Sequence, residues 1–293
     1  MHTKPYGLSG RTVSALGLGA GQIGDPSLDE ARVMRLLNTS LDVGITLIDT
    51  ARSYGLSEDR IGRHLAHRRT EFILSTKVGH GIPGTRDWTG VAIGAGIDEA
   101  LRKLNSDVID IVHLHSCELN VLQTGEVVEA LLRARDQGKV RTVAYSGENE
   151  ALAFAVASGS FGGIECSVNL FDQASLDSIL PRAAERGMGV IAKRPLGNAP
   201  WRFDNRPVGD YCEVYWERMQ RLAYDASGLP WSELALRFSA FRPGVSSAIV
   251  GTSSIEHLQH AVAVVEKGPL PEDVIAAIRQ RFQAVGAGWK GEV

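Results

Sequence analysis

Short apolar segments alternate with helical patterns along most of this chain, and this alternation constrains its fold more than any other feature. Each apolar segment is followed by apolar residues at helical spacing, as in the helix expected from an N-cap at Ser27 to Gly44. Strands are expected at residues 13–19, 45–49, 72–77, 108–115, 142–146, 164–168, 189–192 and 247–250.

The number of repeated units indicates the fold class. Eight strand-helix units in 293 residues match an α/β chain folded as a (β/α)8 TIM barrel, for which about 250 residues are typical. We expect a single domain over residues 1–293, with an N-terminal hairpin around residues 7–11 and an extra C-terminal helix over residues 271–284. In such barrels the chemistry gathers at the carboxyl ends of the strands.

Composition narrows the partners and the compartment. The net charge is -3 and no block of basic residues occurs, so we expect no binding to nucleic acid. Because no run of about 18 apolar residues exists and the first residues lack the apolar core of a signal peptide, we expect no membrane span and a cytoplasmic location. The three cysteines are far apart, which favours reduced thiols over a disulfide framework.

Successive predicted strands end in ionisable groups. These are Asp49, Lys77 and His115, and Tyr54 follows Asp49 on the next loop. A lone buried Lys or His is expensive to desolvate, so groups at corresponding strand ends are better explained as partners in one site. A structural ion pair between Asp49 and Lys77 is the competing explanation. The position of Tyr54, where a phenol can reach that pair, favours catalysis.

From residue 13 to about residue 265 the sequence resembles the aldo-keto reductases, and the resemblance rests on these four residues in their strand contexts. That family carries an Asp, Tyr, Lys and His tetrad in this order. The resemblance implies hydride transfer between a nicotinamide dinucleotide and an aldehyde, a ketone or the corresponding alcohol. Tyr54 is then the general acid or base, and Lys77 lowers the pKa of its phenol. Asp49 holds the Lys charged, and His115 orients the carbonyl oxygen of a small-molecule substrate.

The resemblance also implies a set of cofactor contacts, some of which depart from the family pattern. The family usually holds the nicotinamide with a Ser-Asn pair and a Gln, and the matching positions here are Ser146-Gly147 and Glu165. Asn149 is a candidate for the missing amide. The expected cofactor contacts are Gly19, Asp49, Ser146, Asn149, Glu165, Arg194, Leu196, Gly251, Thr252, Ser253 and His257.

In the comparison with the family, the choice between NADP(H) and NAD(H) depends on His257. His257 stands where the family commonly has the Arg that holds the 2′-phosphate. Because histidine is mostly neutral at pH 7, it is a weaker partner for a dianion. Arg194 and the amides of residues 251–254 offer further anion contacts. We therefore expect NADP(H) to be favoured and NAD(H) to be accepted.

Two other motifs suggest different functions. Gly19 to Gly24 form a Gly-x-Gly-x-x-Gly run after a strand, as in dinucleotide-binding doubly wound sheets, but residues 25–27 separate the run from its helix. His113 and His115 lie two apart on one strand and face the same side, so a metal-dependent barrel hydrolase is an alternative. A non-catalytic barrel that keeps the cofactor pocket is a third function class.

Aromatic residues on rim loops are candidates for substrate binding, together with Tyr54 and His115. Trp88 lies on the loop after the Lys77 strand, and Trp201 lies in the long segment 198–215. Such aromatics are suited to covering an apolar or sugar-like substrate. Packing against the barrel is an equal alternative for either residue.

Overall fold

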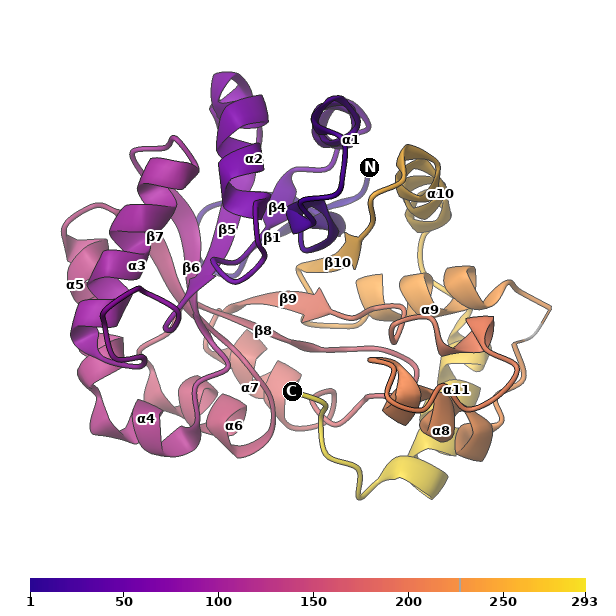
Figure 1. The fold of residues 1–293 in the computed structure, drawn as a ribbon. Coiled ribbons are helices and arrows are strands. Elements are labelled where there is room, and N and C mark those ends of the chain that lie inside the picture. The colour runs from indigo at the N-terminus through magenta and orange to yellow at the C-terminus, as the bar shows by residue number, and fades with distance from the viewer. Residues whose placement is uncertain (227) are drawn as a thin grey trace.

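Eight parallel strands close into a barrel surrounded by helices in the computed structural model, which describes residues 1–226 and 228–293 (Figure 1). Around the barrel the strands follow the order β10, β3, β4, β5, β6, β7, β8 and β9. Their bounds are Leu16–Gly19 for β3, Leu47–Asp49 for β4, Ile73–Val78 for β5, Ile109–His115 for β6, Val140–Ser146 for β7, Gly163–Ser167 for β8, Gly189–Lys193 for β9 and Ser247–Gly251 for β10. The predicted (β/α)8 barrel is confirmed.

The helices lie outside the barrel, and the start of the first one differs from the prediction. The N-cap of α1 is Asp29 and not Ser27, because the Asp29 carboxylate accepts a 2.8 Å hydrogen bond from the Arg32 amide. Helix α4 was not predicted. The bounds are Glu30–Asp42 for α1, Ser57–Leu65 for α2, Gly90–Lys103 for α3, Leu119–Thr124 for α4, Glu126–Asp136 for α5, Asn149–Ser158 for α6, Ile179–Glu185 for α7, Glu213–Leu222 for α8, Trp231–Ala240 for α9, Ile255–Glu266 for α10 and Glu272–Gly286 for α11. Short 3-10 helices cover Gln22–Gly24 (η1), Ala66–Glu71 (η2) and Pro200–Arg202 (η3).

Among the described residues, no helix has both the length and the apolar character needed to cross a membrane.

The N-terminal hairpin closes the floor of the barrel. Strand β1 (Thr3–Pro5) pairs antiparallel with β2 (Thr12–Ser14), so the single strand predicted over residues 13–19 is divided between the hairpin and β3. Tyr6 follows β1 and is only 1% exposed. A Cβ atom at Gly163 would lie 2.1 Å from the Tyr6 hydroxyl, and one at Gly189 would lie 2.5 Å from its ring. These two glycines leave the space that the Tyr6 ring fills.

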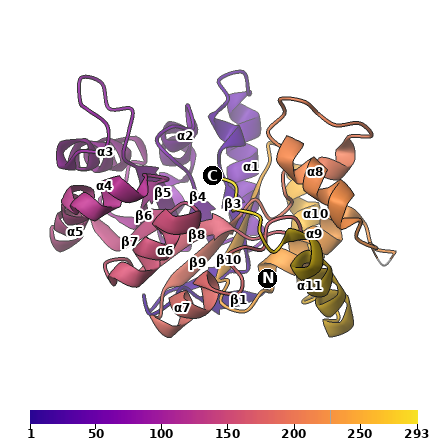
Figure 2. The ribbon, with the colours of Figure 1, turned by 90° about the horizontal axis from the view of Figure 1, so that it is seen from below.

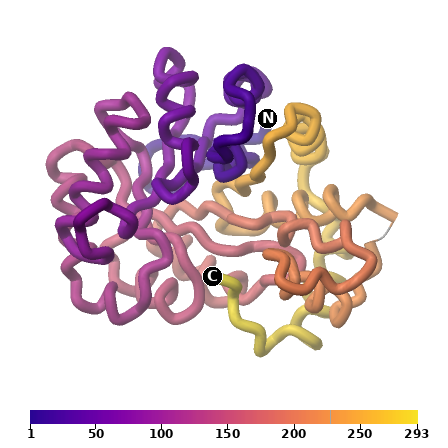
Figure 3. The backbone as a smooth tube through the Cα atoms, in the orientation of Figure 1, coloured from indigo at the N-terminus to yellow at the C-terminus, as the bar shows by residue number. Residues whose placement is uncertain are grey.

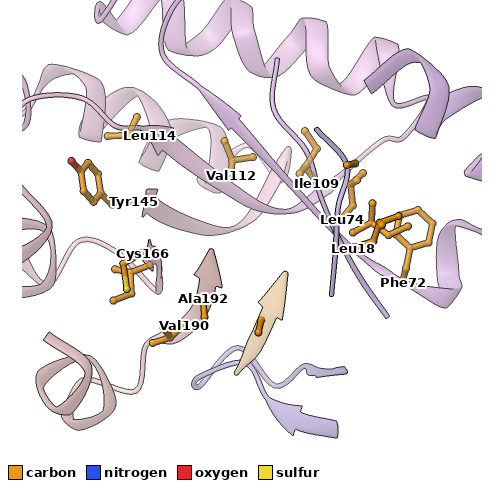
Figure 4. Close-up of a cluster of buried hydrophobic side chains, with 14 of the residues drawn as sticks. Leu18, Phe72, Leu74, Ile109, Val112, Leu114, Tyr145, Cys166, Val190 and Ala192 are labelled. Carbon is orange, nitrogen blue, oxygen red and sulfur yellow. The ribbon is translucent and has the colours of Figure 1, made fainter. Parts of the chain in front are cut away.

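Strand residues alternate between two environments. Outward-facing side chains such as Leu74, Val112 and Val190 belong to the buried apolar layer between the strands and the helices (Figure 4). The inward-facing apolar residues form a separate cluster inside the barrel: Val13, Leu47, Ile73, Ile111, Ala144, Ile191 and Ile249, with Tyr6. Nearer the carboxyl ends of the strands the inward-facing residues are polar, and this is where the site lies.

Helices α8, α9 and α11 pack together beside the barrel around a second apolar cluster that includes Phe171 and Phe238. The tail after α11 leaves this bundle and returns over the barrel (Figure 2; Figure 3). It is held there because the Glu292 amide donates a 2.9 Å hydrogen bond to Asp172 and the Arg218 guanidinium donates to the Glu292 carboxylate. The tail therefore forms part of the wall of the barrel mouth.

Candidate active site

The structure brings Asp49, Tyr54, Lys77 and His115 together at the barrel mouth. Asp49 and His115 are the last residues of β4 and β6, and Lys77 is the last but one of β5. The Lys77 ammonium donates a hydrogen bond to the Asp49 carboxylate and a second one, of 3.0 Å, to the Thr50 carbonyl oxygen. Its Nζ lies 5.2 Å from the centre of the Tyr54 ring, and the His115 ring lies edge-on to Tyr54 at 5.9 Å.

Two loops touch each other to place Tyr54. A Cβ atom at Gly24 would lie 1.8 Å from the Tyr54 carbonyl oxygen, and Gly55 has a φ of 53°. Ser57 ties the same loops together, because its hydroxyl donates to the Ala20 carbonyl oxygen at 2.8 Å. Gly24, the last glycine of the Gly-x-Gly-x-x-Gly run, thus allows the close approach of the Tyr54 loop. The doubly wound alternative is wrong, since the strands close into a barrel.

Burial and mutual charge set the protonation of the cluster. Burial lowers the pKa of Lys77, but the Asp49 and Glu165 carboxylates outweigh it, so the pKa lies above its usual value and the ammonium stays charged. Burial and the nearby Glu165 carboxylate raise the pKa of Asp49 to about 6, against the opposing effect of Lys77. Burial, assisted by the Lys77 charge, lowers the pKa of His115 to about 2. His115 is therefore a neutral imidazole at neutral pH.

The pKa of Tyr54 differs from the expectation. The Lys77 ammonium is the largest single influence and lowers the pKa of the phenol, but burial and the carboxylates of Asp49 and Glu165 together outweigh it. The net pKa is therefore above the usual value, and the prediction of a lowered pKa is wrong. The sequence argument weighed the Lys77 cation and left out the burial of the phenol and the effect of the two carboxylates on it.

The two strand histidines do not form a metal-binding pair. The described residues contain one group of side chains that could hold a metal, and it consists of Asp49, His113 and Glu165, without His115. The Lys77 ammonium lies among these groups, hydrogen-bonded to Asp49 and 3.4 Å from Glu165. His113 is fully buried, with Nδ1 at 3.4 Å from the Thr76 carbonyl oxygen. A metal ion bound by Asp49, His113 and Glu165 would therefore lie next to the Lys77 ammonium and be repelled by it.

Two adjoining cavities open at the mouth, and Tyr54 and Arg194 line both. The first has a volume of about 460 Å³ and also includes His115, Ser146 and Glu165. The second has a volume of about 690 Å³ and extends from the catalytic residues to the first turn of α10. Of the predicted cofactor contacts, the second cavity includes Gly19, Asp49, Arg194, Leu196, Gly251 and His257.

Three predicted cofactor residues lie outside both cavity linings. Asn149 is engaged elsewhere, because its side-chain amide exchanges two 2.9 Å hydrogen bonds with the backbone of Gly291 in the tail. Thr252 is buried, and its hydroxyl accepts a 3.0 Å hydrogen bond from the Ser254 amide within the loop after β10. Ser253 lies on the same loop, where its carbonyl oxygen accepts a hydrogen bond from Arg32.

The two predicted substrate tryptophans have different surroundings. Trp88 is separated from His115 by the His80 ring. The Trp88 and His80 ring centres are 5.6 Å apart, and those of His80 and His115 are 5.4 Å apart. Trp201 is stacked on Trp231 at 6.0 Å in the second apolar cluster. Trp201 lines neither of the two cavities, so the structure favours the packing role for it.

Sequence reasoning missed several residues of the site. Two of these residues, His80 and Lys193, line the first cavity. Lys193 is the last residue of β9 and contacts the Glu148 carboxylate at 3.3 Å. The rule that found Lys77, an ionisable group at a strand end, also applies to Lys193. No comparable pattern marks Arg32, which reaches the loop after β10 from helix α1.

Comparison with known proteins agrees with this geometry. An L-galactose dehydrogenase of Arabidopsis thaliana is 27% identical over 280 residues, which cover 89% of this chain and 87% of that protein. A D-threo-aldose 1-dehydrogenase of a Pseudomonas species is 28% identical over 286 residues, covering 84% of this chain and 87% of that protein. The holo form of an aldo-keto reductase from Bacillus halodurans has a TM-score of 0.84 at 26% identity and covers 96% of both chains.

The family match spans the barrel and all four residues of the tetrad. The model of the aldo/keto reductase family matches residues 15–281. Together with the closed barrel and the grouping at its mouth, this match shows that the chain is an oxidoreductase that belongs to the aldo/keto reductase family.

Proposed function

We propose that this protein catalyses reversible hydride transfer between a nicotinamide dinucleotide, with NADPH preferred, and an aldehyde or ketone or the corresponding alcohol. The observation that carries the proposal is the position of Tyr54, next to the Lys77 and Asp49 ion pair and edge-on to a neutral His115, on the wall shared by the two cavities. A phenol in contact with a fixed ammonium is suited to general acid catalysis.

The second cavity fits a dinucleotide in shape and charge. Gly19 and Gly251 pair across β3 and β10, and the Gln22 side chain packs against Gly251, where a Cβ atom would lie 2.2 Å from it, so all three residues line this end of the cavity. The Arg194 guanidinium donates to the Glu292 carbonyl oxygen and to the hydroxyls of Tyr211 and Ser167. Arg194 forms no ion pair among the described residues, so its charge can pair with a phosphate. When bound in this cavity, the nicotinamide cofactor supplies or accepts the hydride.

Residues of the chain transfer the proton and stabilise the charge that the transfer leaves. Neutral His115 donates a hydrogen bond to the substrate carbonyl oxygen and orients it toward Tyr54. Tyr54 transfers its proton to that oxygen as negative charge develops on it. The Lys77 ammonium stabilises the phenolate left behind, and Asp49 keeps the ammonium in place. In alcohol oxidation the same groups act in reverse, with the Tyr54 phenolate as base.

A panel of carbonyl compounds tests the proposal, and the sugar dehydrogenases among the relatives make aldoses and their lactones the first substrates to try. Oxidation of NADPH and reduction of NADP are followed by absorbance, and binding of both dinucleotides is followed by quenching of tryptophan fluorescence. We expect saturable binding and turnover of at least one carbonyl compound. Binding without turnover across the panel would favour the non-catalytic barrel, and metal-dependent hydrolysis in the absence of dinucleotide would favour the hydrolase.

A further inference from the structure

Lys77 contacts two buried carboxylates. Besides Asp49, the Glu165 carboxylate from β8 approaches it, with Oε2 at 3.4 Å from Nζ. Glu165 is 2% exposed, and its Oε2 has no hydrogen-bond partner among the described residues. The same oxygen lies 3.9 Å from His113 Nε2, which also lacks a partner there. This Glu165 oxygen therefore acts on the neighbouring groups through its negative charge, which no hydrogen bond among the described residues stabilises.

The balance of charge around Lys77 follows from this contact. One ammonium faces two carboxylates, so the field that would draw the proton from the nearby Tyr54 phenol is largely cancelled. Both carboxylates act on Tyr54 in the direction that keeps its proton in place. With Asp49 alone, the cluster would have no net charge, and the phenolate would be easier to form.

The other titratable groups that face Glu165 do not replace it. From β6, His113 is neutral, since burial lowers its pKa to about 3. From the barrel floor, Tyr6 is a neutral phenol, because burial and the Glu165 charge raise its pKa. From β9, the Lys193 ammonium is paired with Glu148 at 3.3 Å. Among the described residues, Asp49 from β4 and Glu165 are thus the carboxylates that form ion pairs with the Lys77 ammonium.

We propose that Glu165 is a positioning residue that acts through Lys77 to hold the Tyr54 phenol in its protonated form, and so extends carbonyl reduction to higher pH. This inference rests on the proposed function, in which Tyr54 is the proton donor. Its consequence is a bias in the pH dependence: reduction, which needs the phenol, persists into alkaline solution, and oxidation, which needs the phenolate, requires a still higher pH.

The test removes the charge with little change of shape. Glu165→Gln keeps the length of the side chain, and Glu165→Asp keeps the charge. Glu58→Gln is the matched control, because Glu58 is also buried and accepts a 2.7 Å hydrogen bond from Thr76, the residue beside Lys77. Glu58 makes no ion pair with Lys77 among the described residues, so the control repeats the chemical change outside the cluster.

Two measurements are made on each variant. One is the pH profile of kcat/KM for carbonyl reduction, whose alkaline limb reports ionisation of the acid in the free enzyme. The other is an ultraviolet difference titration against the same variant carrying Tyr54→Phe, which reports the Tyr54 phenol without any turnover. If Glu165→Gln fails to fold, Glu165→Leu is a second uncharged replacement for the same measurements.

For Glu165→Gln we expect the proton affinity of Tyr54 to fall about tenfold, the size expected for removing one partly screened neighbouring charge. The alkaline limb of the pH profile should move about one pH unit lower in Glu165→Gln. Glu58→Gln should keep this limb at the wild-type pH, and Glu165→Asp should keep the wild-type titration of the Tyr54 phenol. An unchanged phenol titration in Glu165→Gln, or an equal change in Glu58→Gln, would overturn the inference. A uniform loss of activity with an unchanged titration would also overturn it. If no variant and no wild-type protein turns over substrate, the proposed function fails, and the titration still decides the role of Glu165.

Discussion

Arg32 Nε donates a 3.0 Å hydrogen bond to the carbonyl oxygen of Ser253 and so ties helix α1 to the loop after β10. This contact brings a guanidinium to the loop whose amides the sequence comparison offers to an anion, and this loop leads to His257 in the lining of the second cavity. A guanidinium is always charged at neutral pH and binds phosphate in a bidentate manner. Arg32 is therefore a candidate for the 2′-phosphate contact that the sequence comparison assigned to His257.

We expect Arg32→Ala to weaken NADPH binding by roughly tenfold, the usual worth of one charge-assisted hydrogen bond, and to leave NADH binding unchanged. Fluorescence titration with both dinucleotides measures the two dissociation constants. Arg35→Ala is the control, because Arg35 is an exposed arginine one turn further along the same helix. Equal weakening of NADPH and NADH in Arg32→Ala would remove Arg32 from the phosphate site.

His257 should contribute to the preference for NADPH, because it lines the second cavity at the position that the sequence comparison gives to the 2′-phosphate contact. We expect His257→Ala to narrow the preference for NADPH over NADH while retaining binding of both dinucleotides. Fluorescence titrations of wild type and variant with the two dinucleotides measure the preference. An unchanged preference in His257→Ala would remove His257 from the phosphate site.

Tyr54→Phe removes the proposed proton donor and keeps the ring that Lys77 contacts. We expect kcat for carbonyl reduction to fall by about 10²–10⁴-fold, the usual contribution of general acid catalysis, with dinucleotide binding largely unchanged. Steady-state kinetics and fluorescence titration of the same preparation provide the two values. Turnover near that of wild type would exclude Tyr54 as the acid.

His113 should make the folded state sensitive to acid. Its folded pKa of about 3 is below the ordinary imidazole value of about 6.5, so its contribution to stability is complete above pH 6.5 and is lost as the pH falls toward 3. As the pH falls through that window, the unfolding free energy of His113→Asn should therefore decrease less steeply than that of wild type, by up to about 1.4 kcal/mol per pH unit. Urea denaturation of both proteins at several pH values gives the slope of unfolding free energy against pH for each. The opposing contribution of Asp49 is present in both proteins and cancels in the difference between the two slopes. Parallel curves would show that His113 is charged in the folded state.

Trp201→Ala should act on stability and not on substrate binding. Loss of the stack on Trp231 and of the contact with Phe171 should lower the unfolding free energy by roughly 3 kcal/mol, the lower end for aromatic truncations in packed clusters, because Trp201 is only partly buried. Michaelis constants should stay at the wild-type values across the carbonyl panel. A raised KM with unchanged stability would instead return Trp201 to the substrate site.

The sequence was sufficient for the barrel and for the grouping of the tetrad because both depend on local rules. Alternation along a strand decides which side chains face inward, and the carboxyl ends of barrel strands share one face. Asp49, Lys77 and His115 follow from these two rules alone. Their meeting point is independent of the length of the helices and loops between them.

Contacts between distant parts of the chain did not follow from such rules. Asn149 and Gly291 are 142 positions apart, and Arg32 and Ser253 are 221 positions apart. The contact between Glu165 and Lys77 joins β8 and β5, which are not neighbours in the barrel. Glu165 adds to burial and to Asp49 in raising the pKa of Tyr54, because the electrostatics of a closed barrel depend on groups that face each other across its interior.

The Tyr6 ring at the barrel floor has a consequence for the supply of protons. It fills the amino-terminal end of the interior beneath Gly163 and Gly189, so Lys77, Asp49 and Glu165 exchange protons with water at the opposite end, past Tyr54. A substrate that fills the mouth then also separates the cluster from the solvent. In the proposed reaction, the proton that Tyr54 gives up would then be replaced from the open mouth once the product has left.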